Sequence, residues 1–381
     1  MLIGKREIGP SQPPYIIAEI GVNHDGSVER ALQLVDAAAD AEADAVKLQL
    51  FKADLLMSKA AKLAAYQKAA GESDPIEMLR RLELSIDQMR PIVERAHARG
   101  IHAIVTVFSL ELIAEAEKLA WDAYKTASPD IIHRPLLEAL MATGKPLIVS
   151  TGASTLEEVT RAAEWLKPAH QRLAVLQCVS CYPTPRQHGE FGGILALRDA
   201  LELPIGYSDH TPGAIEGSFA VALGACVLEK HFTHSRKAPG PDHAASLEAP
   251  DFEFYARQAR SAARARTIHL APTQFTRVPD DENDPKIQPS FDEAAMELLR
   301  TQTVFERVKR VIDIEQDVRR VSRQSIVTKH SLPIGHTLAS ADLTFKRPGT
   351  GIEPFRLSEV IGRRLVRSVE ADMPLMEADL G

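Results

Sequence analysis

Two stretches decide the fold, IGYSDHTPG at residues 205–213 and VLEKHFTHSRKAPGPDHAASLE at residues 227–248. Each begins with a short apolar run that is typical of a buried strand, and a histidine, His210 or His231, stands just beyond that run. In a parallel barrel the carboxyl ends of neighbouring strands lie side by side, so residues far apart in sequence can share one divalent metal ion. We therefore expect His210 and His231 to meet at one end of such a barrel.

From residue 15 onward, strand-like runs alternate with segments of helical periodicity, which is the pattern of a parallel sheet with helical crossovers. Eight strands are predicted, the number that closes a barrel, at residues 15–18, 45–48, 102–105, 123–125, 147–149, 174–177, 205–207 and 226–228. The helices are predicted at residues 28–41, 86–99, 110–119, 134–143, 156–166, 193–201 and 214–223. The predicted fold class is α/β, a (β/α)8 barrel.

The remaining segments predict additions to this barrel. Residues 58–81 are long for a barrel loop and predict a wall or lid over the site. After a helix near residue 251, we expect an exposed connector at 271–290 and a charged, helix-prone arm at 291–321, with an apolar stripe of Leu298, Leu299, Phe305, Val308 and Ile312. Residues 322–381 predict a small β-rich unit, in which LPIGHTLASADL (332–343) and VEADMPLMEADL (369–380) echo each other. The predicted domains are residues 1–290, 291–321 and 322–381.

The composition narrows the function classes. The chain has 381 residues, 45% of them apolar, and its formal charge of −7 from 45 basic and 52 acidic residues argues against general nucleic-acid binding. No apolar run approaches the roughly 18 residues of a membrane span, and the amino terminus lacks a signal-peptide core, so a cytoplasmic enzyme is expected. Three cysteines, Cys178, Cys181 and Cys226, are an odd set that predicts no disulfide framework.

Polar side chains accumulate where the predicted strands end. Two lysines among several hydroxyl groups suit a ligand with phosphate and carboxylate groups. Two carboxylates suit proton handling, and a metal ion on the histidines would polarise an aldehyde oxygen. This set suggests carbon–carbon bond formation between an anionic enol donor and an aldehyde. Its members are Glu19, Lys47, Gln49, Thr106, Lys125, Ser128, Ser150, Ser180, Tyr182, Ser208, His210, His231 and Asp242.

Two other interpretations fit the same residues. Lys47 or Lys125 could form a Schiff base with pyruvate in an aldolase, because buried lysines are readily tuned. Alternatively, the chain could be a non-catalytic, carbohydrate-binding barrel. Borohydride trapping of pyruvate would favour the first, and measured turnover with any hexosamine would exclude the second.

As a set of motifs, the chain resembles the sialic acid synthase family, also called nonulosonic acid synthases. The matching stretches are IIAEIGVNHDGS (16–27), AVKLQLFKAD (45–54), YKTASPDI (124–131), PLIVSTGAS (146–154), LQCVSCYPTP (176–185), IGYSDHTPG (205–213), LEKHFTHSRKAPGPDHAASLE (228–248) and FKRPGTGIEP (345–354). The resemblance implies a (β/α)8 barrel with a small C-terminal antifreeze-like domain, the SAF domain. It also implies condensation of phosphoenolpyruvate with an N-acyl hexosamine aldehyde, with C–O cleavage and release of phosphate.

The resemblance further implies roles for single residues. His210 and His231 would hold a divalent ion, Mn²⁺ or Mg²⁺, and Glu19 would act near the new bond or the attacking water. Arg347 would donate to the acyl-amino group of the sugar across a domain-swapped homodimer, for which the planar fork of an arginine is suited. Phosphoenolpyruvate would be held by Lys47, Thr106, Lys125, Ser128, Ser150 and Ser208 with Ser180 beside it, and the sugar by Tyr182, Asp130 and Asp242.

The chain departs from the family pattern in three places. VTVFS at residues 105–109 replaces the more usual STPF, and Ser180 stands where some members carry asparagine, which leaves details of the donor site open. The arm at 291–321 is longer than usual, which leaves the linker path and dimer geometry open.

The acceptor also stays open among N-acetylmannosamine, its 6-phosphate and a diacetamido-trideoxyhexose, although PGPDHAASLE (239–248) resembles bacterial members that use unphosphorylated sugars.

Overall fold

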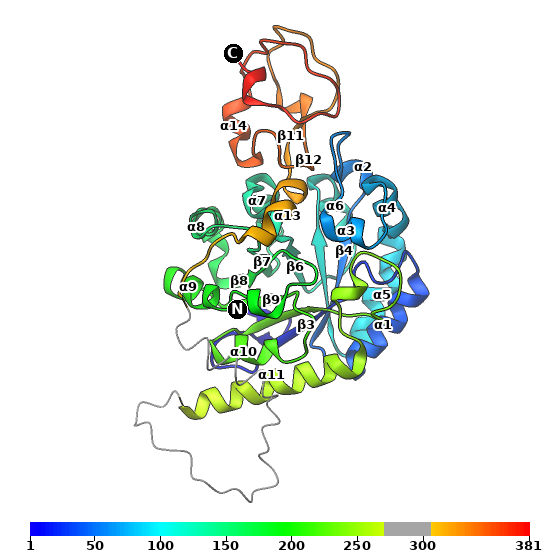
Figure 1. Ribbon diagram of the computed structural model, residues 1–381, viewed down its shortest axis with the longest axis vertical. Coiled ribbons are helices and arrows are strands. Elements are labelled where there is room, and N and C mark those ends of the chain that lie inside the picture. Colours follow the sequence, from blue (N-terminus) through cyan, green and yellow to red (C-terminus); the bar gives the residue numbers. More distant parts are fainter. Residues whose placement is uncertain (270–305) are drawn as a thin grey trace, which may run out of the picture.

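A computed structural model of the chain describes residues 1–269 and 306–381. Its main part is a closed barrel of eight parallel strands (Figure 1), which confirms the predicted fold class. Each strand is hydrogen-bonded to the next along the chain, and the last pairs with the first. The strands are β3 (Tyr15–Glu19), β4 (Ala45–Leu50), β5 (His102–Val107), β6 (Ala123–Thr126), β7 (Leu147–Ser150), β8 (Leu173–Cys178), β9 (Ile205–Asp209) and β10 (Val227–His231).

All eight predicted strands are therefore present, and each extends further at its carboxyl end than predicted. Most of the extra residues are polar, such as Glu19, Ser150 and His231. Apolar runs predict where a strand is buried, but the ladder of hydrogen bonds continues into the polar residues that face the barrel mouth.

Alternation along each strand divides the barrel into an interior and an outer layer. In β3, Tyr15 and Ile17 pack inside with the equivalent residues of the other strands, whereas Ile16 and Ala18 pack outward in the larger core beneath the helices. A two-stranded hairpin of β1 (Leu2–Ile3) and β2 (Arg6–Glu7) adds Ile3 to the inner cluster. The lower half of the barrel is thus a packed apolar plug, and the functional residues are restricted to the upper half.

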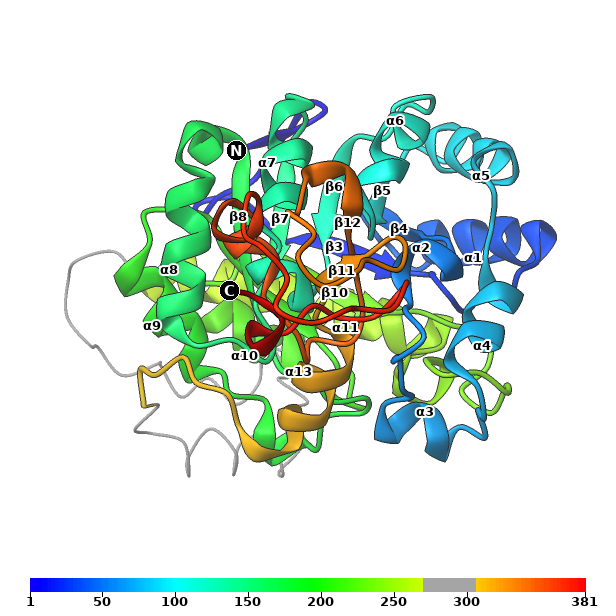
Figure 2. The ribbon, with the colours of Figure 1, turned by 90° about the horizontal axis from the view of Figure 1, so that it is seen from above.

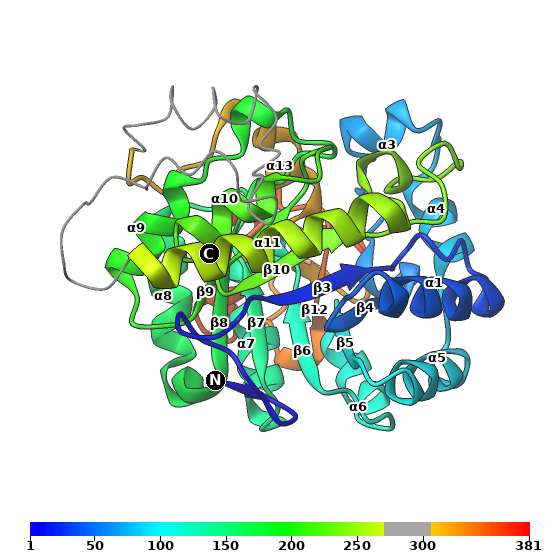
Figure 3. The same cartoon turned by 90° about the horizontal axis from the view of Figure 1, so that it is seen from below.

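Helices cover the barrel and largely follow the prediction. They are α1 (Val28–Asp40), α5 (Ile86–Ala98), α7 (Arg134–Ala142), α8 (Leu156–Trp165), α9 (Gly192–Ala200), α10 (Glu216–Ala222) and α11 (Ala249–His269). Ser85 caps α5, and Thr155 with Glu158 forms the predicted capping box of α8. The third crossover is shorter than predicted, with only η1 (Leu110–Leu112) and α6 (Ile113–Ala116). Seen from below, α11 crosses beneath the barrel (Figure 3), where it packs against α10.

The long loop after β4 is the wall that its length predicted. It contains α2 (Ala53–Leu56), α3 (Ala65–Ala69) and α4 (Pro75–Leu82). Helices α2 and α4 share an apolar cluster with Phe51 and Phe108, whereas Tyr66 of α3 packs with Val318 and Val321. Asp74 caps α4 by accepting from two backbone N–H groups, and Pro75 follows at its first position. The insertion is therefore a packed element with a core of its own.

The C-terminal unit sits above the mouth of the barrel (Figures 1 and 2). It contains the antiparallel pair β11 (Ser325–Thr328) and β12 (Leu343–Lys346), and the short helix α14 (Leu357–Val360). The predicted internal echo is real: each copy ends in a 3-10 turn, η7 (Ser340–Asp342) or η9 (Glu377–Asp379). In both turns the aspartate side chain accepts from the backbone N–H three residues earlier, and the two copies pair at Leu332 and Val369.

The predicted connector at 271–290 lies outside the described residues, as does the first part of the arm at 291–321. In the remainder of the arm, helix is limited to η6 (Asp313–Glu315) and α13 (Gln316–Ser322). Val308 of the predicted stripe is exposed at the surface. Among the helices described, none has the length and apolar character needed to cross a membrane.

Candidate functional site

The carboxyl ends of the strands surround a cavity that opens beneath the C-terminal unit. Its wall includes every predicted site residue except Asp130, which is buried. The lining residues named from the sequence are Glu19, Lys47, Gln49, Thr106, Lys125, Ser128, Ser150, Ser180, Tyr182, Ser208, His210, His231, Asp242 and Arg347. One cavity thus receives side chains from all eight strands or the loops that follow them.

Lys47 lines the cavity, and its ammonium group has two partners. Its ammonium group forms an ion pair with Glu19, which is its direct neighbour in the register of β3 and β4, and it donates to Thr106 Oγ1 at 3.0 Å. Burial lowers the pKa of Lys47 to about 8, with Lys125 acting in the same sense and Glu229 opposing it. The amine is therefore poised between its charged and neutral forms near physiological pH.

Lys125 has its own carboxylate partner, which the sequence analysis missed. Glu229 Oε2 lies 3.4 Å from Lys125 Nζ, and Ser208 donates to Glu229 Oε1 at 3.1 Å. Burial alone would raise the pKa of Glu229, but the nearby Lys125 and Lys47 outweigh it and lower the pKa to about 2. A signal was present, since Glu229 stands two residues before His231 and must face the same side of its strand.

Serines line the side of the cavity next to Lys125. Ser128 Oγ accepts from the backbone N–H of Gly152 at 2.9 Å, whereas the hydroxyls of Ser150 and Ser180 are buried without a partner among the described residues. A Cβ atom on Gly152 would lie 2.2 Å from Ser180 Oγ and 2.9 Å from Ser128 Oγ. Glycine is required there because the serines converge on its backbone. Unpartnered buried hydroxyls in a cavity are suited to an anionic ligand.

The two predicted metal-ligating histidines meet, with ring centres 5.5 Å apart. His210 donates from Nδ1 to the carbonyl oxygen of Val179 at 2.7 Å, which leaves Nε2 available. Burial, reinforced by the adjacent His210, lowers the pKa of His231 and keeps that imidazole neutral. Its Nδ1 atom is buried without a hydrogen-bond partner in the described residues.

These two rings fit a divalent cation as a pair of imidazole nitrogen ligands. Asp242 Oδ2 lies 3.7 Å from His231 Nδ1, too far for a hydrogen bond. Within residues 1–269 and 306–381, no group of three or more His, Cys, Asp or Glu side chains is arranged to enclose a metal. An ion on His210 and His231 would therefore keep open positions for substrate or water, as catalytic sites do.

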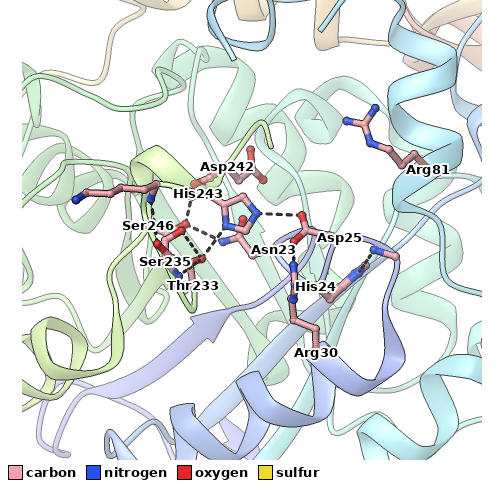
Figure 4. Close-up of polar contacts among 12 residues, drawn as sticks. Asn23, His24, Asp25, Arg30, Arg81, Thr233, Ser235, Asp242, His243 and Ser246 are labelled. Atoms are coloured by element: carbon pink, nitrogen blue, oxygen red, sulfur yellow. Dashed lines mark hydrogen bonds and ion pairs between the residues drawn. The ribbon is translucent and has the colours of Figure 1, made fainter. Parts of the chain in front are cut away.

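Asp242 belongs to a loop that a polar network fixes to the loop after β3 (Figure 4). Ser246 donates to the carbonyl oxygen of Asp242 at 2.7 Å, and Asn23 donates to Ser246 Oγ at 2.8 Å. His243 bridges Thr233 at 2.7 Å and Asp25 at 3.0 Å. Burial raises the pKa of Asp242 itself to about 6. The network presents this carboxylate to the cavity beside His231.

Arg347 enters the cavity from the C-terminal unit. Its backbone pairs with the insertion, since Arg347 N–H donates to Leu56 O at 2.8 Å and Ser58 N–H donates to Arg347 O at 3.0 Å. The guanidinium lies over the Phe108 ring, 5.5 Å from its centre. In the structure this contact is made within one chain.

Asp130 does not line the cavity, and its contact with the sugar stays a prediction. It is buried away from the cavity wall and accepts from Gln324 Nε2 at 3.4 Å. Burial raises the pKa of Asp130 to about 7, and the charge of Arg347 opposes that rise. The charges of Asp130 and Arg347 therefore interact.

The outer wall of the cavity is largely apolar, which the sequence analysis did not foresee. It comes from the insertion and neighbouring loops, and Tyr66 of α3 stacks on Tyr182 with ring centres 4.9 Å apart. The sequence has no motif for these wall positions, because any apolar residue that packs well can fill them. The apolar residues are Val22, Phe51, Leu56, Met78, Leu79, Leu82, Phe108 and Val318.

Comparison with known proteins gives consistent matches over the whole chain. A model of the NeuB family matches residues 34–269, and a model of the SAF domain matches residues 323–381. The chain is 34% identical over 380 residues to the N,N'-diacetyllegionaminic acid synthase of Legionella pneumophila, covering 98% of this chain and 96% of that protein. It is 31% identical over 367 residues to the Campylobacter jejuni protein of the same name, covering 95% and 98%.

A solved structure also matches along the full length. The spore coat polysaccharide biosynthesis protein SpsE of Bacillus subtilis superimposes with a TM-score of 0.79 at 26% identity, covering 100% of this chain and 99% of that chain. The order of barrel and C-terminal unit is thus shared with that protein.

Proposed function

Because the chain belongs to the NeuB family and carries a SAF domain, we propose that it is a metal-dependent nonulosonic acid synthase that condenses phosphoenolpyruvate with an N-acyl hexosamine aldehyde. The observation that carries this proposal is the convergence in one cavity of two ammonium groups, from Lys47 and Lys125, and two imidazoles, from His210 and His231. The ammonium groups and unpartnered hydroxyls suit the donor, and the two imidazoles suit a divalent ion at the aldehyde.

In the proposed reaction, C3 of phosphoenolpyruvate forms a bond to the aldehyde carbon, whose oxygen takes a proton. Water adds at C2, the bond between C2 and the phosphate oxygen breaks, and inorganic phosphate leaves. Lys47, Lys125 and the serines would bind the phosphate and carboxylate of the donor. Glu19, bonded to Lys47, and Asp242, with a pKa raised to about 6, would exchange protons with water and the sugar oxygen.

A divalent ion held by His210 and His231 would polarise the aldehyde carbonyl as a Lewis acid. The protein residues around it orient the sugar. Tyr182 packs on His210 with ring centres 4.1 Å apart, and Arg347 reaches the same space from above. We propose that Arg347 donates to the acyl-amino carbonyl of the acceptor.

Phosphate release tests the proposal. We expect release to require both phosphoenolpyruvate and an N-acyl hexosamine, and to stop when EDTA removes the metal. A panel of N-acetylmannosamine, its 6-phosphate and a diacetamido-trideoxyhexose identifies the acceptor. Rapid release from phosphoenolpyruvate without any sugar would contradict the proposal, whereas turnover with one of these sugars would exclude a purely carbohydrate-binding protein.

One observation favours a second candidate, a Schiff-base aldolase acting on pyruvate. Burial lowers the pKa of Lys47 to about 8, which gives a larger neutral fraction than an ordinary lysine has. Borohydride in the presence of pyruvate would then attach a pyruvate-derived group to Lys47, detectable by mass spectrometry. Absence of that mass increase removes this candidate.

We further propose that the active form is a homodimer in which the C-terminal unit covers the barrel of the partner. Domain swapping keeps the contacts of the closed chain, so the interface around Arg347 would be the same in either arrangement. The stretch 270–305 joins the foot of the barrel to the segment at its mouth and is long enough in sequence to serve both.

A further inference from the structure

A buried glutamate lies outside the predicted set of site residues. Glu315, in η6, is 1% exposed and precedes the C-terminal unit. Its Oε1 atom accepts from the backbone N–H of Ala153 at 2.6 Å and from that of Ser180 at 2.8 Å. The other oxygen accepts from Ile312 N–H at 3.1 Å. In each of these bonds the acceptor is a carboxylate oxygen, which makes the bond stronger than one between neutral groups.

The two amides belong to different loops of the barrel. Ala153 lies in the loop after β7, the strand that ends at Ser150, and Ser180 lies in the loop after β8. Between them Gly152 leaves no room for even a methyl group beside the Ser180 and Ser128 hydroxyls. A displacement of a few tenths of an ångström in either loop would therefore move the serines of the donor site.

We propose that Glu315 is a positioning residue for phosphoenolpyruvate binding. This inference rests on the proposed function. One carboxylate oxygen fixes the spacing of the two loops, so the hydroxyls of Ser150 and Ser180 are preorganised toward the donor before it binds. Glu315 acts through these loops and does not line the cavity.

The segment that carries Glu315 is anchored independently of it. Arg319 of α13 and Arg323, which follows that helix, both bind Glu158, the buried glutamate of the α8 capping box, at 2.8 and 2.7 Å. Both arginines also donate to the carbonyl oxygen of Ala153, so the loop after β7 has a second tether to this segment. Loss of the Glu315 carboxylate should therefore leave α13 and the Ala153 carbonyl docked, and it should free the Ser180 N–H, so that the loop after β8 can move relative to the loop after β7.

Titration of phosphoenolpyruvate into the protein with Mn²⁺ and without sugar, followed by calorimetry, tests the inference. We expect Glu315→Ala to weaken binding by about 10-fold, the effect of one to two lost hydrogen bonds. Glu315→Gln keeps an oxygen that can accept from both amides and should stay within about threefold of the unchanged chain. Asp313→Ala, an exposed neighbour in the same turn, is the matched control and should bind normally.

Steady-state kinetics provide a readout that a merely structural role would not move. The KM for phosphoenolpyruvate should rise in Glu315→Ala while the KM for the acceptor stays the same. If the alanine variant does not fold, Glu315→Asp, which keeps the charge but cannot reach both amides, should show the same selective loss. Normal donor affinity in a folded Glu315→Ala or Glu315→Asp chain overturns the inference. Failure of the unchanged chain to bind phosphoenolpyruvate would overturn the proposed function, and this inference with it.

Discussion

Lys47 combines a buried position with a charge that the proposed donor needs. Its pKa is lowered by burial from 10.5 to about 8, so its ammonium is lost at a lower pH than that of an ordinary lysine. We expect kcat/KM for phosphoenolpyruvate to fall as pH rises through about 8, because the neutral amine no longer attracts the anion. Lys47→Gln should lower kcat/KM roughly 100-fold or more at pH 7. Phosphate release measured from pH 6 to 10 checks both.

The matched control is Lys62→Gln, which removes an exposed lysine of the insertion and should leave the profile unchanged. Lys47→Arg tests whether the fall of kcat/KM above pH 8 comes from residue 47, since an arginine stays protonated from pH 6 to 10. Whatever activity Lys47→Arg retains should not decline near pH 8. A decline of kcat/KM at the same pH in this variant would show that another group causes the fall.

At the scale of single residues, the sequence predicts the groups at strand ends well and their partners poorly. Lys47, Lys125 and both histidines follow from the position at which an apolar run stops. Glu229 was missed although it directly follows Leu228, where the apolar run of its strand stops. Asp130 was assigned to the sugar by resemblance, and its hydrogen bond with Gln324 depends on a contact between distant parts of the chain.

Helix α13 is the element that ties the C-terminal unit to the barrel, through Glu158. Burial would raise the pKa of Glu158, but Arg323 and Arg319 outweigh it and hold that pKa well below its usual range. A carboxylate with a lowered folded-state pKa stabilises the fold above its unfolded pKa, and the contribution is lost as pH falls through the folded value. Glu158→Gln should therefore cost roughly 3 kcal/mol of stability at pH 7, measured by urea unfolding.

The difference in the free energy of unfolding between Glu158→Gln and the unchanged chain should shrink below about pH 4. There Glu158 takes up a proton in the unfolded chain while it is still charged in the folded chain. Glu157→Gln alters the exposed neighbour on the same helix and serves as the control. An equal loss of stability in both variants would show that the arginine contacts contribute little.

At the scale of elements, periodicity predicted the eight strands and most helices because these are fixed by burial on one face. It overestimated the third crossover, where η1 and α6 make a short irregular turn between β5 and β6. It also predicted one continuous arm up to residue 321, although the last part is extended before η6. There, hydrogen bonds to the barrel replace the regular bonds of a helix, and no local pattern records them.

The whole molecule raises the question of which chain supplies Arg347 to a given barrel. If the homodimer is swapped as proposed, mixing a Lys47→Gln chain with an Arg347→Ala chain should restore activity. Each mixed dimer would have one intact site, so about half of the sites should regain full activity once the mixed dimers have been isolated. Phosphate release after co-expression and purification by two different tags measures this.

Each variant alone provides the baseline, and both should be close to inactive. Mixed dimers that stay at this baseline would show that Arg347 serves its own barrel, as it does within the chain described here. Size-exclusion chromatography with light scattering establishes that mixed dimers are present before their activity is measured.

The alternation that fills the barrel with Tyr15, Ile17 and their counterparts also aims Glu19 and Lys47 into its mouth. Inserting one residue in a strand would turn every later side chain to the opposite face, and inserting two would lift it by roughly 6–7 Å. The alternation that fills the core of the barrel therefore also decides which polar side chains of each strand face the cavity. Under the proposed function, divergence towards new sugars is then confined to the loops and the overlying unit, and directed evolution of this chain should begin with the apolar wall of the cavity instead of the strands.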